Sequence, residues 1–243
     1  MSKVTTYWQQ LYQQSQRVDL QHMPVEHMQL NHNLALSAAL DTSKANWLPS
    51  PAKGVKRLVL EREGGEKTIR ATSIVAYAAN SQFTPHAHPK GEEFFVIAGT
   101  FSDEDGDYPA GTYVRNPPGS SHQPFSREGC LIWVKLQQFA VDDKQNIVID
   151  VDQKTADISN DQLGRKVLFD DYETVEWVDV KQTSVLPGLW LAKGAEILVL
   201  SGELSDDKQR FEQGYWIRIA PHDKVTLTAG QNSQFLIKYG HLA

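Results

Sequence analysis

The chain has 243 residues, of which 40% are hydrophobic and 22% are charged, a composition typical of folded proteins and not of disordered chains. This length exceeds that of an average domain and predicts two domains. The formal net charge is −6, and the basic residues are scattered along the chain, so the sequence argues against a nucleic-acid partner.

The sequence points neither to a membrane protein nor to an oxidising compartment. Residues 1–18 are rich in Gln and lack the apolar centre of a signal peptide, and no apolar run approaches the roughly 20 residues that span a bilayer. The single cysteine, Cys130, excludes an intramolecular disulfide and a Cys-rich zinc module. We therefore expect a cytoplasmic protein without a membrane partner, in which Cys130 is a packed residue and not a nucleophile.

The predicted elements begin with a short helix at residues 3–16, where Val4, Trp8, Leu11 and Tyr12 fall on one face. From about residue 46 the pattern changes to short apolar runs separated by Gly, Pro, Asn and Asp, which predicts an all-β sandwich or barrel. The clearest strands are expected at 55–60, 72–78, 94–97, 131–136 and 197–200.

An internal repeat organises the β-rich part of the chain. Residues 90–103, KGEEFFVIAGTFSD, recur as residues 193–206, KGAEILVLSGELSD, so the copies are offset by 103 residues. The same offset maps Arg115 onto Arg218 and Lys135 onto Lys238. Two copies of one barrel follow, and we predict an N-terminal helix and extension at 1–45, a first barrel at 46–140, a connection at 141–163 and a second barrel at 164–243.

Three histidines and one glutamate of the first copy have the spacing of metal ligands. His86 and His88 are two residues apart, so on a strand both imidazoles face the same way. Glu92 begins the next predicted strand, and a Pro/Gly turn at 117–119 leads to His122. Three imidazoles and one carboxylate, with positions left open, suit one divalent ion of Fe, Zn, Mn, Ni or Cu.

These residues resemble the motifs of the cupin superfamily. The first motif, G(X)5HXH(X)3E(X)6G, is met except at its leading Gly, where Asn80 stands. The second motif, G(X)5PXG(X)2H, is met in full by residues 111–122. Segments 92–103, 107–122 and 129–130 are similar to the ChrR-type cupin domain, and this resemblance covers residues 47–140 closely and 165–240 weakly.

The resemblance implies two tandem jelly-roll barrels, known as double-stranded β-helices, and a metal held by His86, His88, Glu92 and His122. The ChrR sensor domain carries zinc and related cupin dioxygenases carry iron, so Fe or Zn is the expected ion. ChrR-type anti-sigma factors also have an N-terminal zinc module with a Cys-containing motif. No cysteine precedes residue 47 here, so we do not expect this chain to bind a sigma factor.

The second copy lacks every ligand of the first. The offset maps the four ligand positions onto Leu189, Leu191, Ala195 and Val225. Such side chains cannot hold a dication, but they can fill the vacated cavity as ordinary core. We expect a degenerate, metal-free barrel, and an apolar ligand pocket at the same place is the alternative.

Four further residues are candidates for a substrate pocket beside the metal. Tyr113 and Arg115 share a face of the strand that leads to His122 and could orient a substrate carbonyl or carboxylate. Arg115 recurs in the copy without ligands, so a structural salt bridge is the alternative for it. Phe94 and Val96 share the face of Glu92 and are expected to wall the cavity or to pack as core.

An acidic run at residues 103–107 lacks the spacing of an EF-hand calcium loop. We interpret this run as a solvated hairpin tip.

The sequence leaves more than one class of function open. One is a metal-dependent dioxygenase or related oxidoreductase acting on a small oxygenated organic compound, with Glu92 as the candidate base. The other is a non-catalytic, zinc-binding sensor or small-molecule-binding protein without an anti-sigma module, or a scaffold whose metal is structural. Fold alone cannot choose between them. The oligomeric state is also open, and a homodimer is one option.

Overall fold

The computed structural model describes residues 6–18 and 27–242, and these residues form two compact units. Unit 1 comprises residues 1–32 and 45–152, and unit 2 comprises residues 33–44 and 153–243, in each case as far as they are described. Among the described residues, no helix has the length and apolarity needed to cross a membrane.

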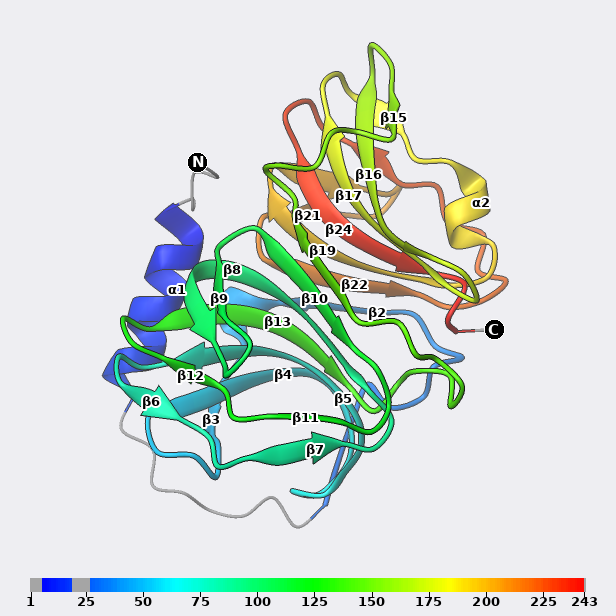
Figure 1. Cartoon of the computed structure of the whole chain (residues 1–243). Helices are drawn as coiled ribbons and strands as arrows, with labels where there is room; N and C mark the ends of the chain where they lie inside the picture. Colours follow the sequence, from blue (N-terminus) through cyan, green and yellow to red (C-terminus); the bar gives the residue numbers. More distant parts are fainter. Residues whose placement is uncertain (1–5, 19–26, 243) are drawn as a thin grey trace. The chain divides into compact units, whose positions relative to one another are not determined.

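Unit 1 is built on one antiparallel sheet with the strand order β1-β4-β5-β13-β8-β10-β14 (Figure 1). Shorter strands extend it, since β3 pairs with β4, β9 pairs with β8, and β12 pairs with both β6 and β8. Strands β7 and β11 form a separate two-stranded sheet. The elements are α1 (Thr6–Arg17), β1 (Met28–Leu30), β3 (Trp47–Pro49), β4 (Val55–Gly64), β5 (Thr68–Tyr77), β6 (Ser81–Gln82), β7 (His86–His88), β8 (Glu92–Ser102), β9 (Asp107–Pro109), β10 (Thr112–Asn116), β11 (Ser120–His122), β12 (Phe125–Ser126), β13 (Cys130–Leu136) and β14 (Ile147–Asp150).

Alternation along the strands gives the unit 1 sheet two chemically different faces. The inward face carries a buried apolar cluster that includes Phe94, Val96, Val114, Ile132 and Val134. Residues between these positions point to the opposite face because successive side chains of a strand alternate. The sheet therefore supplies apolar walls on the side where β7 and β11 close the barrel.

A β-bulge in β4 changes which side chains reach the barrel interior. Val59 pairs with Ser73 and Glu61 with Thr72, so Leu60 is the extra residue between them. Without the bulge, alternation from Arg57 would send residues 59, 61 and 63 inward. With it, Arg62 pairs with Ala71 and shares the inward face.

Unit 2 repeats the same arrangement with the strand order β15-β16-β17-β24-β19-β22-β2, and a second sheet has the order β18-β23-β20-β21. The elements are β2 (Ala38–Asp41), a 3-10 helix (Thr42–Lys44), β15 (Ile158–Ser159), β16 (Leu163–Asp170), β17 (Thr174–Val180), β18 (Ser184–Val185), α2 (Gly188–Leu191), β19 (Ala195–Ser201), β20 (Glu203–Ser205), β21 (Arg210–Glu212), β22 (Tyr215–Ile219), β23 (Thr228–Ala229) and β24 (Gln234–Tyr239).

The predicted all-β architecture of two barrels with a short N-terminal helix is confirmed, and the repeat offset holds in three dimensions. β10 and β22 begin at residues 112 and 215, and β9 and β21 at residues 107 and 210, each pair 103 residues apart. The copies differ at the equivalents of β7 and β11. Residues 189–191 lie in the helical turn α2, and residues 223–225 form no strand.

The expected linear boundaries differ from the observed units at both ends of unit 1. Residues 33–44, expected in the N-terminal extension, belong to unit 2 because β2 pairs with β22, with Ala38 opposite Arg218. The expected connection at 141–163 is not a plain linker, because its first part forms β14 and pairs with β10. Its later part contains β15, which pairs with β16.

The departure at Asn80 is explained by backbone geometry. Asn80 has φ +58°, a left-handed conformation that Gly adopts freely and that Asn tolerates better than most other residues. Gly99, which the motif retains, has φ +74°, and a Cβ there would lie 2.1 Å from the carbonyl oxygen of Gly129. The first position needs a conformation that Asn can supply, whereas the second needs the absence of a side chain.

Candidate metal centre

The three histidines converge because β7 and β11 pair in antiparallel register. His86 lies opposite His122, and His88 lies opposite Ser120, two residues further along the same face. The ring centroids are 5.1 Å apart for His86 and His88, 5.2 Å for His86 and His122, and 4.6 Å for His88 and His122. One nitrogen from each ring can be chosen so that all three lie within 4.8 Å of one another. His88 and His122 are buried, and His86 is more accessible.

Glu92, the first residue of β8, brings a carboxylate to the same point. Its Oε2 lies 3.6 Å from Nε2 of His88 and 3.5 Å from Nε2 of His122. Asn116, at the end of β10, donates a long hydrogen bond of 3.4 Å to the same oxygen. The four residues predicted as ligands therefore come from three strands, and the two buried imidazoles share the carboxylate.

The Nδ1 atoms of the three rings are engaged outside the cluster. His86 Nδ1 donates to the carbonyl of Thr84 at 3.0 Å, His88 Nδ1 contacts Ser120 Oγ at 3.3 Å, and His122 Nδ1 donates to Asp103 Oδ2 at 3.1 Å. A ring whose Nδ1 carries the proton presents a lone pair at Nε2. Such outer contacts fix the tautomer and the orientation of metal-ligating histidines.

The Nε2 atoms of His88 and His122 are buried and have no hydrogen-bond partner among the described residues. Buried polar atoms are normally satisfied, because an unsatisfied one costs on the order of 1–3 kcal/mol. Two such atoms that face one carboxylate form an arrangement that a divalent cation would satisfy. Three imidazole nitrogens and one carboxylate oxygen also form a donor set that divalent transition metals accept, so the residues fit a bound metal.

The surroundings of the two buried rings shift their pKa values in opposite directions. Burial lowers the pKa of His88, and the other imidazoles of the cluster add to this effect, whereas Glu92 offsets only part of it. Burial also disfavours the charged form of His122, but the hydrogen bond to Asp103 and the carboxylate of Glu92 outweigh it and raise its pKa. The neutral form of His88 is therefore favoured, and His122 is the more basic of the two rings.

Asp103 is a functional residue that the sequence reasoning missed. The run at 103–107 was expected to be a solvated hairpin tip, but the side chain of Asp103 is buried and 8% of the residue's surface is exposed. Burial opposes its charge, yet hydrogen bonds from His122, from the backbone N–H of Asp105 and from Tyr108 lower its pKa. The repeat hid this role, because the mapped Asp206 only accepts hydrogen bonds from the backbone of its own turn.

A cavity of about 540 Å³ adjoins the cluster. His86, His88 and Glu92 line it, together with apolar side chains of β5 and β13 and with Phe83. This volume is within the range of small-molecule sites, which are mostly apolar and have few polar groups.

The structure corrects the expected positions of Tyr113 and Arg115. Neither lines the cavity, because both point to the outward face of β10, opposite to Val114 of the inward cluster. Tyr113 donates a 2.7 Å hydrogen bond to Glu93 Oε2, and Arg115 forms a buried ion pair with Asp143 at 2.7 Å. The structural alternative for Arg115 is therefore the correct one.

Phe94 and Val96 face inward as expected but pack as core. They belong to the buried cluster of unit 1, where Phe94 contacts Phe101 with a ring separation of 4.6 Å. The cavity wall is instead made by Val75, Ile132 and Val134, together with Tyr77. Aromatic packing still reaches the site, because Phe101 lies 6.0 Å from the His122 ring.

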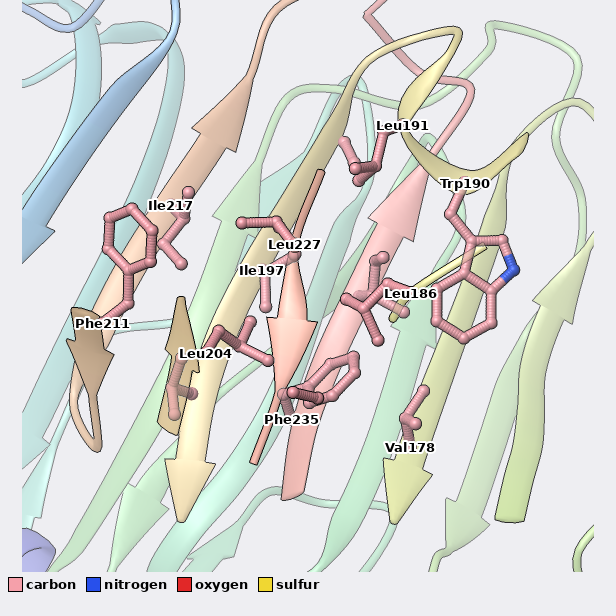
Figure 2. Close-up of a cluster of buried hydrophobic side chains, with 14 of the residues drawn as sticks. Val178, Leu186, Trp190, Leu191, Ile197, Leu204, Phe211, Ile217, Leu227 and Phe235 are labelled. Carbon is pink, nitrogen blue, oxygen red and sulfur yellow. The ribbon is translucent and has the colours of Figure 1, made fainter. Parts of the chain in front are cut away.

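The equivalent place in unit 2 is filled with apolar side chains. Leu191 and Ala195 are buried there and Val225 packs against the same cluster. Leu189, however, is 84% exposed on α2, so it was wrong to expect all four mapped residues in the core. Figure 2 shows Trp190, which has no counterpart among the ligands, entering the cluster from α2 together with Leu191.

A ligand cluster like that of unit 1 does not recur in the described part of unit 2, where no set of three His, Cys, Asp or Glu ligand atoms comes as close together. Trp190 stacks on Tyr239 at 6.0 Å, and the guanidinium of Arg165 lies 4.9 Å from its ring centre. At the sequence positions equivalent to β7, unit 2 thus has a helical turn that carries a buried tryptophan.

Comparison with known proteins finds a family model that matches part of the chain. Residues 36–140 match the family model described as the ChrR cupin-like domain. A comparison with curated protein sequences finds no significant match.

Solved structures share the fold of the whole chain at low identity. A proposed dioxygenase from Nostoc punctiforme is 13% identical, with a TM-score of 0.65 and with 84% of this chain and 82% of that chain covered. The pirin YhhW from Escherichia coli, solved in complex with nickel(II), is also 13% identical, with a TM-score of 0.60 and coverage of 84% and 98%. Oxalate decarboxylase from Bacillus subtilis, which has Mn(II) centres, is 10% identical, with a TM-score of 0.56 and coverage of 83% and 76%.

These likenesses cover 83–84% of the chain and concern the fold. Residues 36–140 therefore match the ChrR cupin-like family model, and the chain has the fold of two tandem cupin barrels.

Proposed function

We propose that this protein binds one divalent metal ion in unit 1 and is a metal-dependent dioxygenase or related oxidoreductase. His86, His88, Glu92 and His122 hold the ion, and the substrate is a small oxygenated organic compound that enters the adjoining cavity. Iron is the ion we favour for this chemistry, although the donor set also accepts Zn, Mn, Ni or Cu.

The observation that carries the proposal is the pair of buried, unpartnered Nε2 atoms of His88 and His122. Each lies within about 3.6 Å of Glu92 Oε2, and the Nδ1 atom of each ring is engaged elsewhere. A structural histidine normally uses both nitrogens in hydrogen bonds. The Nδ1 atom of each ring is thus held by a neighbouring side chain, and the Nε2 atom is available to the proposed ion.

The metal supplies Lewis acidity and, when redox-active, a route for electrons between the substrate and dioxygen. The residues of the chain supply the rest. Glu92 can accept a proton from a substrate group acidified by the metal, and Asn116 orients the carboxylate for this role. In an oxidative cleavage that places both oxygen atoms of O₂ in the products, the four electrons that reduce O₂ come from the substrate, so such a reaction needs no external reductant.

The cavity supports a small-molecule substrate. Its wall residues Val75, Ile132 and Val134 offer an apolar surface beside the histidine cluster that suits the hydrocarbon part of a small molecule. The similarity in fold to a protein described as a proposed dioxygenase adds support from a relative and assigns no activity by itself.

A non-catalytic sensor is the second candidate, and the match to the ChrR cupin-like domain favours it. In that case zinc closes the site, and binding of a ligand alters the surface of unit 1. The described part of the chain contains one cysteine, Cys130, and it is buried in unit 1. A sigma-factor-binding module of the ChrR type is therefore not part of this alternative.

Elemental analysis of protein purified without added metal tests the proposal. About one divalent ion per chain is expected, and His88→Ala should lose most of it, because removing one of four ligands opens the coordination shell. His222→Ala, at an exposed histidine of unit 2, is the matched control and should retain the metal. Full occupancy in His88→Ala would contradict the ligand set.

Oxygen consumption then separates the two functions. Iron-loaded protein should take up O₂ with at least one member of a panel of chelating compounds such as catechols, 1,3-diketones and 2-oxo acids. Tightly bound zinc without turnover would favour the sensor.

A further inference from the structure

The cavity beside the histidine cluster has a second polar end, formed by two arginines of β4. Arg57 and Arg62 both line it, on the inward face that the bulge at Leu60 creates. The remaining wall between them and the cluster is largely apolar. A positive group at one end and a candidate metal centre at the other define a site with two polar anchor points.

The two arginines differ in how their charge is balanced. Arg57 forms a two-pronged ion pair with Glu66, at 2.7 and 2.9 Å. Arg62 donates to the carbonyl of Gly65 and has no carboxylate partner among the described residues. Its residue surface is only 2% exposed, and its Nε has no hydrogen-bond partner there. Arg62 therefore contributes a positive charge to the cavity wall that forms no ion pair in the described part of unit 1 and that Glu66, at longer range, offsets only in part.

A buried charge that is not held in a close ion pair is costly, by several kcal/mol in typical proteins. Burial and the neighbouring Arg57 lower the pKa of Arg62 to about 10, so the guanidinium is still charged at neutral pH. The structure thus retains an unfavourable group in a cavity wall, where an anion can reach it. Guanidinium and carboxylate groups pair with good geometry and with stronger hydrogen bonds than neutral groups do.

The sheet register gives the separation between the two ends. Glu92 pairs with Leu136, Leu136 with Ala71, and Ala71 with Arg62, so the ligand and the arginine lie three strands apart in one row. With strands about 4.8 Å apart, this separation is roughly 14 Å along the sheet. The long arginine side chain and the curvature of the barrel shorten the gap that a ligand must bridge.

We propose that the cavity binds an elongated organic carboxylate, with its anionic end on the Arg62 guanidinium and its other, oxygen-bearing end at the histidine cluster. The apolar wall of Val75, Ile132 and Val134 contacts the hydrocarbon body between the ends. This inference names the substrate class for the proposed function and rests on it for the metal end only, because the carboxylate end depends on Arg62 alone.

Two matched probes test the inference. Suberic acid monohydroxamate carries a metal-chelating hydroxamate at one end and a carboxylate at the other, and octanohydroxamate is its equivalent with a terminal methyl group. Calorimetric titration of the metal-loaded protein should show that the carboxylate probe binds about tenfold more tightly or better. A shorter and a longer pair of the same type cover other separations.

Variants locate the preference. Arg62→Met should abolish it, Arg62→Lys should retain part of it, and Arg127→Met, which removes an exposed arginine of unit 1 outside the cavity lining, should leave it intact. Arg62→Met should not lower the melting temperature, because a methionine of similar length replaces a buried charge that forms no ion pair with a carboxylate of the described residues. A purely structural arginine would behave in the opposite way.

The outcomes separate this inference from the proposed function. His88→Ala should weaken both probes of a pair while the carboxylate preference persists. A preference that depends on Arg62 alongside probe affinities unchanged by His88→Ala would overturn the metal site and keep the anion site. Equal binding of both probes at every chain length, including no binding of either, would overturn the anion site.

Discussion

At the scale of single residues, the unit 1 site depends on atoms that hold the ligands as much as on the ligands. Asp103 accepts a hydrogen bond from Nδ1 of His122 and a second one, of 3.1 Å, from the hydroxyl of Tyr108. This carboxylate–imidazole arrangement keeps the Nε2 lone pair directed toward Glu92. Loss of such an outer contact typically costs 10-fold to 100-fold in metal affinity.

We therefore expect Asp103→Asn to weaken metal binding by about 10-fold to 100-fold without unfolding the barrel. The amide can still bond to the hairpin backbone, but it cannot offer His122 a charged acceptor. Competition titration with a chromogenic chelator measures the change. Asp206→Asn, the counterpart in unit 2, is the control and should have no effect, whereas equal affinities of Asp103→Asn and wild type would refute the role of Asp103.

The environment of Cys130 gives the physical reason for its expected lack of reactivity. It is buried at the start of β13, and burial raises the pKa of its thiol to about 12, an effect that a hydrogen bond with Ser126 only partly offsets. Reactivity of cysteine follows its thiolate, which is scarce under these conditions. The expected packed, inert residue is what the environment produces.

At the scale of elements, the sequence could predict the parts of the site that depend on local spacing. His86 and His88 share a face because they are two residues apart on a strand, and His122 follows a Pro/Gly turn that returns the chain beside them. The bulge at Leu60 was not predictable, because nothing in the run of β4 marks the residue that is left unpaired. Arg62 was missed for that reason.

The glycine at the end of the first motif gives a prediction about an element. Gly99 lies where β8 bends, with φ +74°, and a Cβ would meet the carbonyl oxygen of Gly129 at 2.1 Å and Cys130 Cα at 2.9 Å. Since both obstacles are backbone atoms, they cannot move aside as a side chain could. Gly99→Ala should therefore destabilise the protein by more than about 2 kcal/mol.

Gly119→Ala separates the two causes of this cost. Gly119 has φ +86° but nothing within 4 Å of the position of its Cβ, so only the conformational cost applies, about 1 kcal/mol. Denaturant unfolding followed by circular dichroism compares the variants. Equal loss of stability in both would show that the close approach to Gly129 does not matter.

At the scale of the whole molecule, the repeat predicted two barrels but not which residues complete them. β14 follows the expected end of the first barrel and β2 precedes its start, and each pairs at the equivalent edge strand, β10 or β22. Short strands recruited from distant sequence carry weak local signals, because their pairing is decided by the edge that they cover. Boundaries drawn from linear sequence therefore failed at these segments.

The copies also show how a barrel loses a metal site and keeps its fold. In unit 1, β7 and β11 carry polar ligands over an apolar sheet, and in unit 2 a helical turn carries Trp190 and Leu191 into the same cluster (Figure 2). The sequence predicted that four packed apolar residues replace the four ligands. This prediction was wrong for Leu189, which is exposed and lies outside the core. Trp190, which the offset places between two ligand positions, is buried in the cluster instead.

The two units should consequently respond to different perturbations. Trp190→Ala leaves a void in unit 2 that the helical turn cannot close, and large-to-small changes of this kind cost about 3–5 kcal/mol. Hydrogen exchange measured by mass spectrometry should show faster exchange in β17, β19 and β24, with the metal content unchanged. A chelator should instead speed exchange in β7 and β11, because the bound ion stabilises only the state in which its ligands are assembled. Loss of metal from Trp190→Ala, or a chelator effect confined to unit 2, would contradict the expectation that the core of unit 2 and the candidate metal centre of unit 1 respond independently.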